Sequence, residues 1–379
     1  MNPPKPIEFI DLKAQQKRIR SQLEERIKRV LDHGRYIMGP EVRELEEKLS
    51  DYVGVKHCIT CASGTDALLM PLLAYGVGPG DAVFTSPFTF ISTAEVIAIL
   101  GATPVFVDID PLTFNLDPVK LREVVETIAS HNDLEPKGVI PVDLFGQPAD
   151  YEQIEAVAKE FDLFVLQDAA QSFGAEYKGR KACSQGDVAA TSFFPAKPFG
   201  CYGDGGAIFC EDDNLAERLR SIRVHGEGSH KYENVRLGVN GRFDTIQAAI
   251  LLAKLEILED EVNMRNEVAR RYSRGLKELV EVPAVKPDRT SVWAQYSVLS
   301  DNREEIMAAL KARRIPTAIY YPKPLHLQDA FHSLGYRPGD FPVSEKTAER
   351  IFSLPMHPYL ETDVQGYIIA AVKEAVESK

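Results

Sequence analysis

The chain has 379 residues and a formal net charge of −12 at pH 7, with 44 % hydrophobic and 26 % charged residues. This length and composition predict a globular protein with one large domain and a smaller one. The negative charge argues against sequence-independent binding to nucleic acid or to an anionic membrane, because both require a basic surface. A local basic pocket for an anionic small molecule is compatible with it.

The first twenty residues lack the apolar core of a signal peptide, and no run approaches the roughly 18 apolar residues of a membrane span. The five cysteines are few and irregularly spaced, which favours a reduced, cytoplasmic setting. Cys58 and Cys61 form a C-x-x-C pair, a spacing found in redox and zinc sites. A zinc site needs a second ligand pair at short spacing, and none appears. Two small strand or loop residues are the simpler interpretation.

Taken in chain order, the first predicted elements are two helices over residues 15–33 and 41–53, joined by the turn HGRYIMGP. Short apolar runs then alternate with helical patterns. Seven runs are typical of strands, at residues 57–63, 82–86, 103–110, 137–145, 161–169, 188–194 and 205–212. Helices are predicted between most of them, near residues 65–76, 89–100, 117–130 and 150–160. This alternation predicts a mostly parallel seven-stranded sheet covered by helices, an α/β fold.

The last two of these strands are separated only by the loop around Lys197, so that pair can depart from the parallel pattern. A helix closed by glycine follows at 214–226, and a proline-free helical segment with room for a bend runs from 244 to 280. Strands near WAQYSVL and PTAIYYP, followed by helices, predict a smaller C-terminal α+β domain. We therefore expect a large domain over residues 1–254 and a small one over 255–379.

Small polar residues follow the first strand, at the edge of an α/β sheet where ligands bind. The stretch ASGTDALL (62–69) opens a helix, and the N–H groups of a helix N-terminus suit a phosphate. Ser63 or Thr65 could add a hydroxyl, although the same sequence is an ordinary N-cap. Asp168 ends an almost wholly apolar strand, where an unpaired carboxylate is costly. Either a buried cation or nearby backbone N–H groups would stabilise it.

Lys197 lies between two prolines in TSFFPAKPFGCYGDGG (191–206), with aromatic residues on both sides. A lysine in a desolvated loop loses part of its preference for the charged form and can act as an amine nucleophile. Ser192, at the end of the preceding strand, could face the same cleft as the phosphate turn. A phosphate turn, a buried aspartate, a serine and a constrained lysine together match pyridoxal phosphate. This cofactor needs a lysine for its Schiff base, an acid against its pyridine nitrogen and a phosphate cup.

These motifs resemble those of the DegT/DnrJ-type nucleotide-sugar aminotransferases, which belong to the aspartate-aminotransferase-like (fold type I) pyridoxal-phosphate enzymes. The likeness covers nearly the whole chain, from EFIDLKAQQ through HGRYIMGPEV, ASGTDAL, FTFIST, DAAQSFGA, TSFFPAKPFGCYGDGGAI and GVNGRFDTIQAA to YYPKPLH and LPMHPYL. It is strongest toward bacterial enzymes that aminate the 3-oxo group of UDP-2-acetamido-2-deoxy-glucuronic acid for O-antigen and other cell-surface polysaccharides.

The resemblance implies a role for each matching residue. Lys197 would form the Schiff base, Asp168 would pair with the pyridine nitrogen, and Gln171 would lie near the 3-hydroxyl of the ring. Phe88 would stack on the ring face. The residues implied to hold the phosphate are Gly64, Thr65, Ser192 and, from the neighbouring subunit of a homodimer with shared sites, Asn240. The residues implied to line the sugar-nucleotide pocket are Gly34, Tyr36, Arg242, Tyr320, Tyr321 and His326.

One position departs from the family pattern, because related sequences often carry histidine where this chain has Tyr320. The implied reaction is a ping-pong transamination with L-glutamate as donor and a UDP-linked 2-acetamido-2-deoxy-3-oxo-uronic acid as acceptor. A C4-aminotransferase acting on a 4-keto-6-deoxy nucleotide sugar is the alternative substrate assignment.

Three other classes of protein are compatible with parts of the sequence. Sugar dehydratases on this fold replace the Schiff-base lysine with histidine, so Lys197 argues against that reaction. An inactive regulatory protein on the same fold would not require Asp168 and Lys197, so the presence of both residues argues against that class. A nicotinamide oxidoreductase is disfavoured because YGDGGA precedes a strand instead of opening a helix, and because an N-terminal G-x-G-x-x-G is missing.

Overall fold

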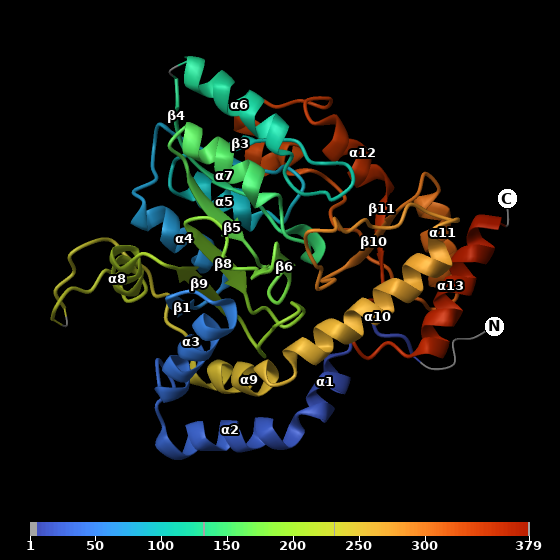
Figure 1. Ribbon diagram of the computed structural model, residues 1–379, viewed down its shortest axis with the longest axis horizontal. Coiled ribbons are helices and arrows are strands. Elements are labelled where there is room, and N and C mark those ends of the chain that lie inside the picture. Colours follow the sequence, from blue (N-terminus) through green and yellow to red (C-terminus); the bar gives the residue numbers. More distant parts are fainter. Residues whose placement is uncertain (1–5, 132, 231, 378–379) are drawn as a thin grey trace.

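A computed structural model describes residues 6–131, 133–230 and 232–377 (Figure 1). The seven predicted strands form one sheet in the order β1-β9-β8-β5-β4-β2-β3. Their bounds are β1 His57–Cys61, β2 Asp81–Thr85, β3 Thr103–Phe106, β4 Glu135–Ile140, β5 Phe164–Asp168, β8 Val188–Ser192 and β9 Gly206–Cys210. All neighbouring pairs are parallel except those of β9, which is antiparallel to both β1 and β8. The prediction of a mostly parallel seven-stranded sheet is confirmed.

Helices cover both faces of the sheet (Figure 1). Along β9, Ala207 and Phe209 pack on one face while Ile208 and Cys210 pack on the other, which is why the strands are apolar on both sides. One face is covered by α4 Gly64–Ala74, α5 Ser92–Ile99 and α8 Asp213–Ile222. The other is covered by α3 Pro40–Val53, α6 Pro118–His131, α7 Tyr151–Glu160 and α9 Thr245–Leu255.

Two long predicted helices are interrupted in the structure. The first consists of α1 Leu12–Arg18 and α2 Arg20–His33, which meet at Ile19. The second consists of α9 and α10 Leu258–Leu276, which meet at an angle (Figure 1). The break after α9 adjoins the predicted domain boundary at residue 255, and the division into domains 1–254 and 255–379 stays a prediction.

The C-terminal α+β region is built on a two-stranded antiparallel sheet of β10 Tyr296–Leu299 and β11 Ile351–Leu354. Its core also includes α10, α11 Arg303–Ala312 and α13 Thr362–Glu377. The prediction of a strand near PTAIYYP was wrong. Across its described residues, that segment forms a single antiparallel bridge, between Ala318 and Ser353, and no strand. Pro316 and Pro322 lack the backbone N–H that a longer ladder needs.

The remaining elements are short. They are the hairpin of β6 Glu176–Tyr177 and β7 Arg180–Lys181, the 3-10 helices Leu144–Gly146, Leu325–Leu327 and Asp329–Leu334, and α12 Pro342–Arg350. Across the described ranges, no helix combines the length and the apolar composition required to span a membrane.

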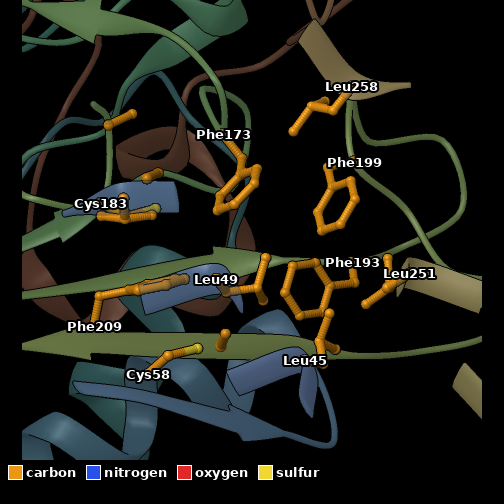
Figure 2. Close-up of a cluster of buried hydrophobic side chains, with 14 of the residues drawn as sticks. Leu45, Leu49, Cys58, Phe173, Cys183, Phe193, Phe199, Phe209, Leu251 and Leu258 are labelled. Atoms are coloured by element: carbon orange, nitrogen blue, oxygen red, sulfur yellow. The ribbon is translucent and has the colours of Figure 1, made fainter. Parts of the chain in front are cut away.

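A hydrophobic cluster fills the space between the sheet, α3 and α9 (Figure 2). Phe193 and Phe199, on either side of Lys197 in the sequence, are both buried in it, with ring centroids 5.6 Å apart and perpendicular planes. Phe173 stacks on Phe199 at 5.0 Å. This core therefore holds both ends of the Lys197 loop.

Candidate active site

The N-terminus of α4 and the end of β8 meet at the carboxyl edge of the sheet. A Cβ on Gly64 would lie 2.6 Å from the Cβ of Ser192, so the close approach requires a glycine. Ser63 caps α4, with its Oγ accepting from the Asp66 N–H at 3.0 Å. Thr65 shares a 2.9 Å hydrogen bond with the hydroxyl of Ser92. The first N–H groups of a helix have no partner within it, so this cradle of N–H and hydroxyl groups suits a phosphate.

Asp168 lies beside this cradle, at the end of β5, and is 4 % exposed. Its Oδ2 accepts a hydrogen bond from the Thr93 hydroxyl at 2.8 Å, and its Oδ1 accepts one from the Ala170 N–H at 3.1 Å. Burial raises the pKa of Asp168, while these hydrogen bonds and the charge of Lys197 lower it. Both stabilising groups considered from the sequence, a backbone N–H and a cation, are therefore present.

Thr93, whose hydroxyl bonds the Asp168 carboxylate, was not among the candidate residues of the sequence analysis. It lies in α5, 75 residues before Asp168. The available signal was the family motif FTFIST, whose last residue is Thr93.

Lys197 is partly buried in a loop between β8 and β9. The loop is closed by backbone hydrogen bonds from Lys197 N to Phe194 O at 2.9 Å and from Cys201 N to Phe193 O at 2.7 Å. Burial lowers the pKa of the Lys197 ammonium group, and the charge of Asp168 raises it. A lowered pKa increases the share of the neutral amine, which is the form that attacks carbonyl carbons and accepts protons.

Gln171, Phe88 and Tyr321 form a group next to Asp168. The Gln171 Oε1 accepts from the Phe145 N–H at 2.9 Å, and its Nε2 donates to the Tyr321 hydroxyl at 3.4 Å. The rings of Phe88 and Tyr321 meet edge to face, 6.1 Å apart. The ring of Tyr320 lies between this group and the N-terminal segment, 6.0 Å from the ring of Tyr321 and 6.4 Å from that of Phe9. The structure thus brings an amide, a phenyl ring and a phenol to one place beside the buried carboxylate.

A second group of predicted residues lies around the start of α9. Gly34 ends α2 with a positive φ of 67°, and the Tyr36 carbonyl accepts from the Thr245 N–H at 2.8 Å. Asn240 is exposed and Arg242 is half-buried, in a segment fixed by a 3.0 Å bond from Gly241 N to Arg223 O. Within the described residues, no hydrogen bond or ion pair joins this group to Asp168 or Lys197.

His326 lies in the 3-10 helix Leu325–Leu327, which is fastened beside Phe88 by a 2.7 Å bond from Leu325 N to Pro87 O. Its ring is buried against Phe341 at 4.6 Å, and its Nε2 lies 3.1 Å from Glu345 Oε1. Burial lowers the pKa of His326, and Glu345 raises it. Contact of His326 with a sugar stays a prediction.

These features fit pyridoxal phosphate. The cradle between Gly64 and Ser192 offers N–H and hydroxyl donors for a phosphate. The buried carboxylate of Asp168 has only uncharged donors, which leaves it suited to a protonated ring nitrogen. Lys197 supplies an amine on a loop that is closed by backbone hydrogen bonds and buried at both ends. A mostly parallel sheet with such a site at its carboxyl edge defines the class of fold type I pyridoxal-phosphate enzymes.

The chain belongs to the DegT/DnrJ/EryC1/StrS aminotransferase family, whose model matches residues 17–373. It is 52 % identical over 367 residues to the UDP-2-acetamido-2-deoxy-3-oxo-D-glucuronate aminotransferase of Pseudomonas aeruginosa, covering 97 % of this chain and 99 % of the relative. The protein is therefore a pyridoxal-phosphate-dependent sugar aminotransferase.

Solved structures agree with this assignment. A DegT DnrJ EryC1 StrS aminotransferase from Brucella abortus superposes with a TM-score of 0.96 at 51 % identity, over 98 % of this chain and 100 % of that one. NtdA from Bacillus subtilis, solved with bound cofactor PMP, superposes with a TM-score of 0.87 at 28 % identity, over 97 % of this chain and 83 % of that one.

Proposed function

We propose that the protein transfers the amino group of L-glutamate to the 3-oxo group of a UDP-linked 2-acetamido-2-deoxy-3-oxo-uronic acid. The reaction would take place in the cytoplasm and supply an amino sugar for O-antigen or another cell-surface polysaccharide. The name of the 52 % identical relative supports the substrate. The observation that carries the chemistry is the meeting of the Gly64–Ser192 cradle, the buried Asp168 and the rigid Lys197 loop.

Each residue near the cradle has a chemical task in this proposal. Gly64, Thr65 and Ser192 hold the phosphate, and Asp168 keeps a negative charge beside the pyridine nitrogen. When bound, pyridoxal phosphate supplies a carbonyl that condenses with amines and a ring that takes up electrons. In the first half-reaction the Lys197 amine would take the proton from the donor Cα and pass it to the C4′ atom of the cofactor. In the second half-reaction it would carry a proton from C4′ to C3 of the sugar. The lowered pKa of Lys197 favours the neutral amine that accepts these protons.

We further infer that the active protein is a homodimer with shared sites. Tyr36 is 49 % exposed, Phe194 51 % and Leu237 87 %, and a partner subunit would cover these apolar side chains. The segment after α8 extends away from the sheet (Figure 1). It returns at Asn240, which forms an antiparallel bridge with Val224. In the dimer, Asn240 of the partner subunit would reach the phosphate and the partner's Arg242 would pair with the uronate.

The substrate assignment is tested by offering three UDP- or dTDP-linked acceptors, each with L-glutamate, and measuring kcat/KM for the aminated product. The acceptors are the 3-oxo-uronate, its neutral 3-keto counterpart and a 4-keto-6-deoxy sugar. We expect the 3-oxo-uronate to be preferred. Preference for the 4-keto sugar would establish the C4 alternative, and no turnover of any of the three acceptors would reject the proposed substrate.

The pairing with the uronate has its own test. Arg242→Lys should reduce kcat/KM for the uronate more than for the neutral sugar, because an ammonium group cannot reproduce the planar, bidentate contact of a guanidinium. Arg274→Lys, an exposed change on α10, is the matched control. Equal losses for both sugars would exclude a contact between Arg242 and the carboxylate.

A further inference from the structure

Lys254 is a lysine in an unusual place. It lies near the end of α9, is 2 % exposed and is among the largest fully buried side chains. Lysine is almost never fully buried unless it is paired, yet within the described residues Lys254 makes no ion pair. Its Nζ instead donates a hydrogen bond to the backbone carbonyl of Gly200 at 2.6 Å. It also lies over the ring of Tyr202, 4.4 Å from the centroid.

Both partners of Lys254 belong to the loop that carries Lys197. Gly200 follows Lys197 by three residues. A Cβ on Gly200 would lie 2.4 Å from the Phe194 carbonyl oxygen and 2.7 Å from that of Pro195, so the two limbs of the loop are in direct backbone contact. A displacement of Gly200 would therefore also displace the limb that precedes Lys197.

α9 holds the second limb of the loop at two points. One is the Lys254–Gly200 hydrogen bond, and the other is a 2.9 Å bond in which the Tyr202 N–H donates to Gln247 Oε1. Leu251, one turn before Lys254 on α9, packs in the same cluster as Phe193 and Phe199 (Figure 2). The helix therefore supports the loop both by apolar packing and by hydrogen bonds.

Burying the ammonium group of Lys254 between α9 and the Lys197 loop carries a desolvation penalty. Burial lowers the pKa of Lys254 to about 8, and the charges of Glu261 and Cys201 raise it by less. An apolar side chain would avoid this desolvation penalty but could not hold the Gly200 carbonyl. The charged hydrogen bond and the cation–π contact are the two interactions that only a cation provides here.

We propose that Lys254 is a positioning residue, whose ammonium group lies over the Tyr202 ring, clamps the Gly200 carbonyl and so fixes the loop that presents Lys197 to the cofactor. The inference rests on the proposed role of Lys197. It adds a second lysine to the machinery of the site, one that acts through the loop and does not touch the cofactor or substrate.

The first test is made on the cofactor-free protein. Lys254→Met keeps an unbranched side chain of similar length and removes the ammonium group. We expect amide hydrogen exchange at Lys197 and Cys201, whose N–H groups close the loop, to become at least roughly tenfold faster, with exchange in β1 and β9 unchanged. Unchanged exchange at these two amides would overturn the proposal. Faster exchange throughout the sheet would overturn it as well, because Lys254 would then stabilise the whole fold and not the loop in particular.

Three further variants test the same contact without changing Lys254, in case Lys254→Met folds poorly. Tyr202→Leu removes the ring beneath the ammonium group at a half-buried position and should loosen the same amides. Tyr202→Phe keeps the ring and should change nothing, because the buried Tyr202 hydroxyl has no partner among the described residues. Lys181→Met is the matched control, since Lys181 lies 4.9 Å from the Tyr52 ring but bonds Glu259, away from this loop. Equal effects of Tyr202→Leu and Tyr202→Phe would contradict the clamp.

The loaded enzyme provides a second readout. In Lys254→Met, kcat should fall roughly 10- to 100-fold with little change in KM, and the pH titration of the cofactor absorbance should shift its midpoint. Borohydride reduction and peptide mapping separate the two proposals. Cofactor trapped on Lys197 together with an unaltered absorbance titration would reject the clamp, whereas cofactor trapped on another lysine would reject the proposed role of Lys197.

Discussion

Asp168 and Lys197 affect each other through their charges. Burial raises the pKa of the carboxyl group and lowers that of the ammonium group, so each loses part of its ionised form. The charge of each group also opposes the change that burial causes in the pKa of the other. Within the described residues, Asp168 and Lys197 form no direct ion pair. The Asp168 carboxylate can therefore still pair with a cationic group bound between the two side chains.

At this scale we predict that Asp168→Asn binds cofactor but turns over slowly. An amide cannot keep a proton on the pyridine nitrogen, and the loss of a charge-assisted, buried pairing should cost a few kcal/mol of barrier, roughly a hundredfold or more in kcat. The measurement is single-turnover kinetics with glutamate. Asp212→Asn, which keeps a good N-cap on α8, is the control. A kcat within about twofold of the parent would mean that Asp168 is only structural.

At the scale of elements, the site depends on the contact between α4 and β8. The helix N-terminus supplies the donors and the strand end supplies Ser192, and the two elements approach so closely that only a glycine fits between them. The N-cap residue Ser63 fixes the first turn of the helix through Asp66. The cradle is thus a property of two elements, neither of which forms it alone.

Gly64→Ala should weaken cofactor binding without unfolding the protein. The added methyl group would meet Ser192 at 2.6 Å and push the strand end away, an overpacking cost of about 1–3 kcal/mol. We expect the dissociation constant for pyridoxal phosphate, measured by equilibrium dialysis, to rise about tenfold or more. Gly366→Ala in α13, where a Cβ has no heavy atom within 4 Å, should leave binding unchanged. Equal affinities for the parent and Gly64→Ala would show that the cradle does not hold the phosphate.

The N-terminal segment packs against the loop after β11, beside His357. Met356 N donates to Phe9 O at 3.1 Å, and His357 lines a cavity of about 110 Å³ with Pro6, Ile7 and Asp11. Burial lowers the pKa of His357 from 6.5 to about 4, with Asp11 acting in the opposite direction. The Nδ1 of His357 is buried without a hydrogen-bond partner among the described residues. The neutral ring is therefore the form that the folded protein accommodates.

This geometry predicts an acid-sensitive contribution to stability. Because the folded-state pKa is below the unfolded value, the contribution is fully present above about pH 6.5 and is lost as the pH falls toward 4. In His357→Gln, the difference in free energy of unfolding from the parent should change by up to about 3 kcal/mol across this window. Urea denaturation at several pH values measures it. A pH-independent difference would mean that His357 titrates normally in the folded protein.

At the scale of the whole molecule, a shared site predicts complementation between inactive variants. Lys197→Ala and Arg242→Ala should each be nearly inactive with the 3-oxo-uronate. In a mixed dimer one of the two sites would have both wild-type residues, so mixing should restore up to about half of the activity per mixed dimer. Subunit exchange is followed with a mass-tagged copy. Exchange without recovered activity would contradict the shared site.

Most of the proposed catalytic centre rests on local sequence patterns. Strand ends, the phosphate turn and the proline-flanked Lys197 are short patterns whose physical meaning does not depend on distant residues. Asp168 was singled out because a carboxylate at the end of an apolar strand needs a partner. The family motifs then extended the interpretation to Gln171 and Phe88, which lie together in the structure.

The rest required the tertiary structure, because it depends on which surfaces pack together. The apolar run of PTAIYYP is typical of a strand, but β11, some fifty residues from β10 in the sequence, pairs with β10 instead. The hydroxyl of Thr93 reaches Asp168 across 75 residues, and Lys254 reaches Gly200 across 54. Such contacts leave no local pattern, since a threonine or a lysine in a helix is ordinarily a surface residue. The sequence by itself determined the class of chemistry and the residues at the strand ends, whereas only long-range packing decided what holds those residues in place.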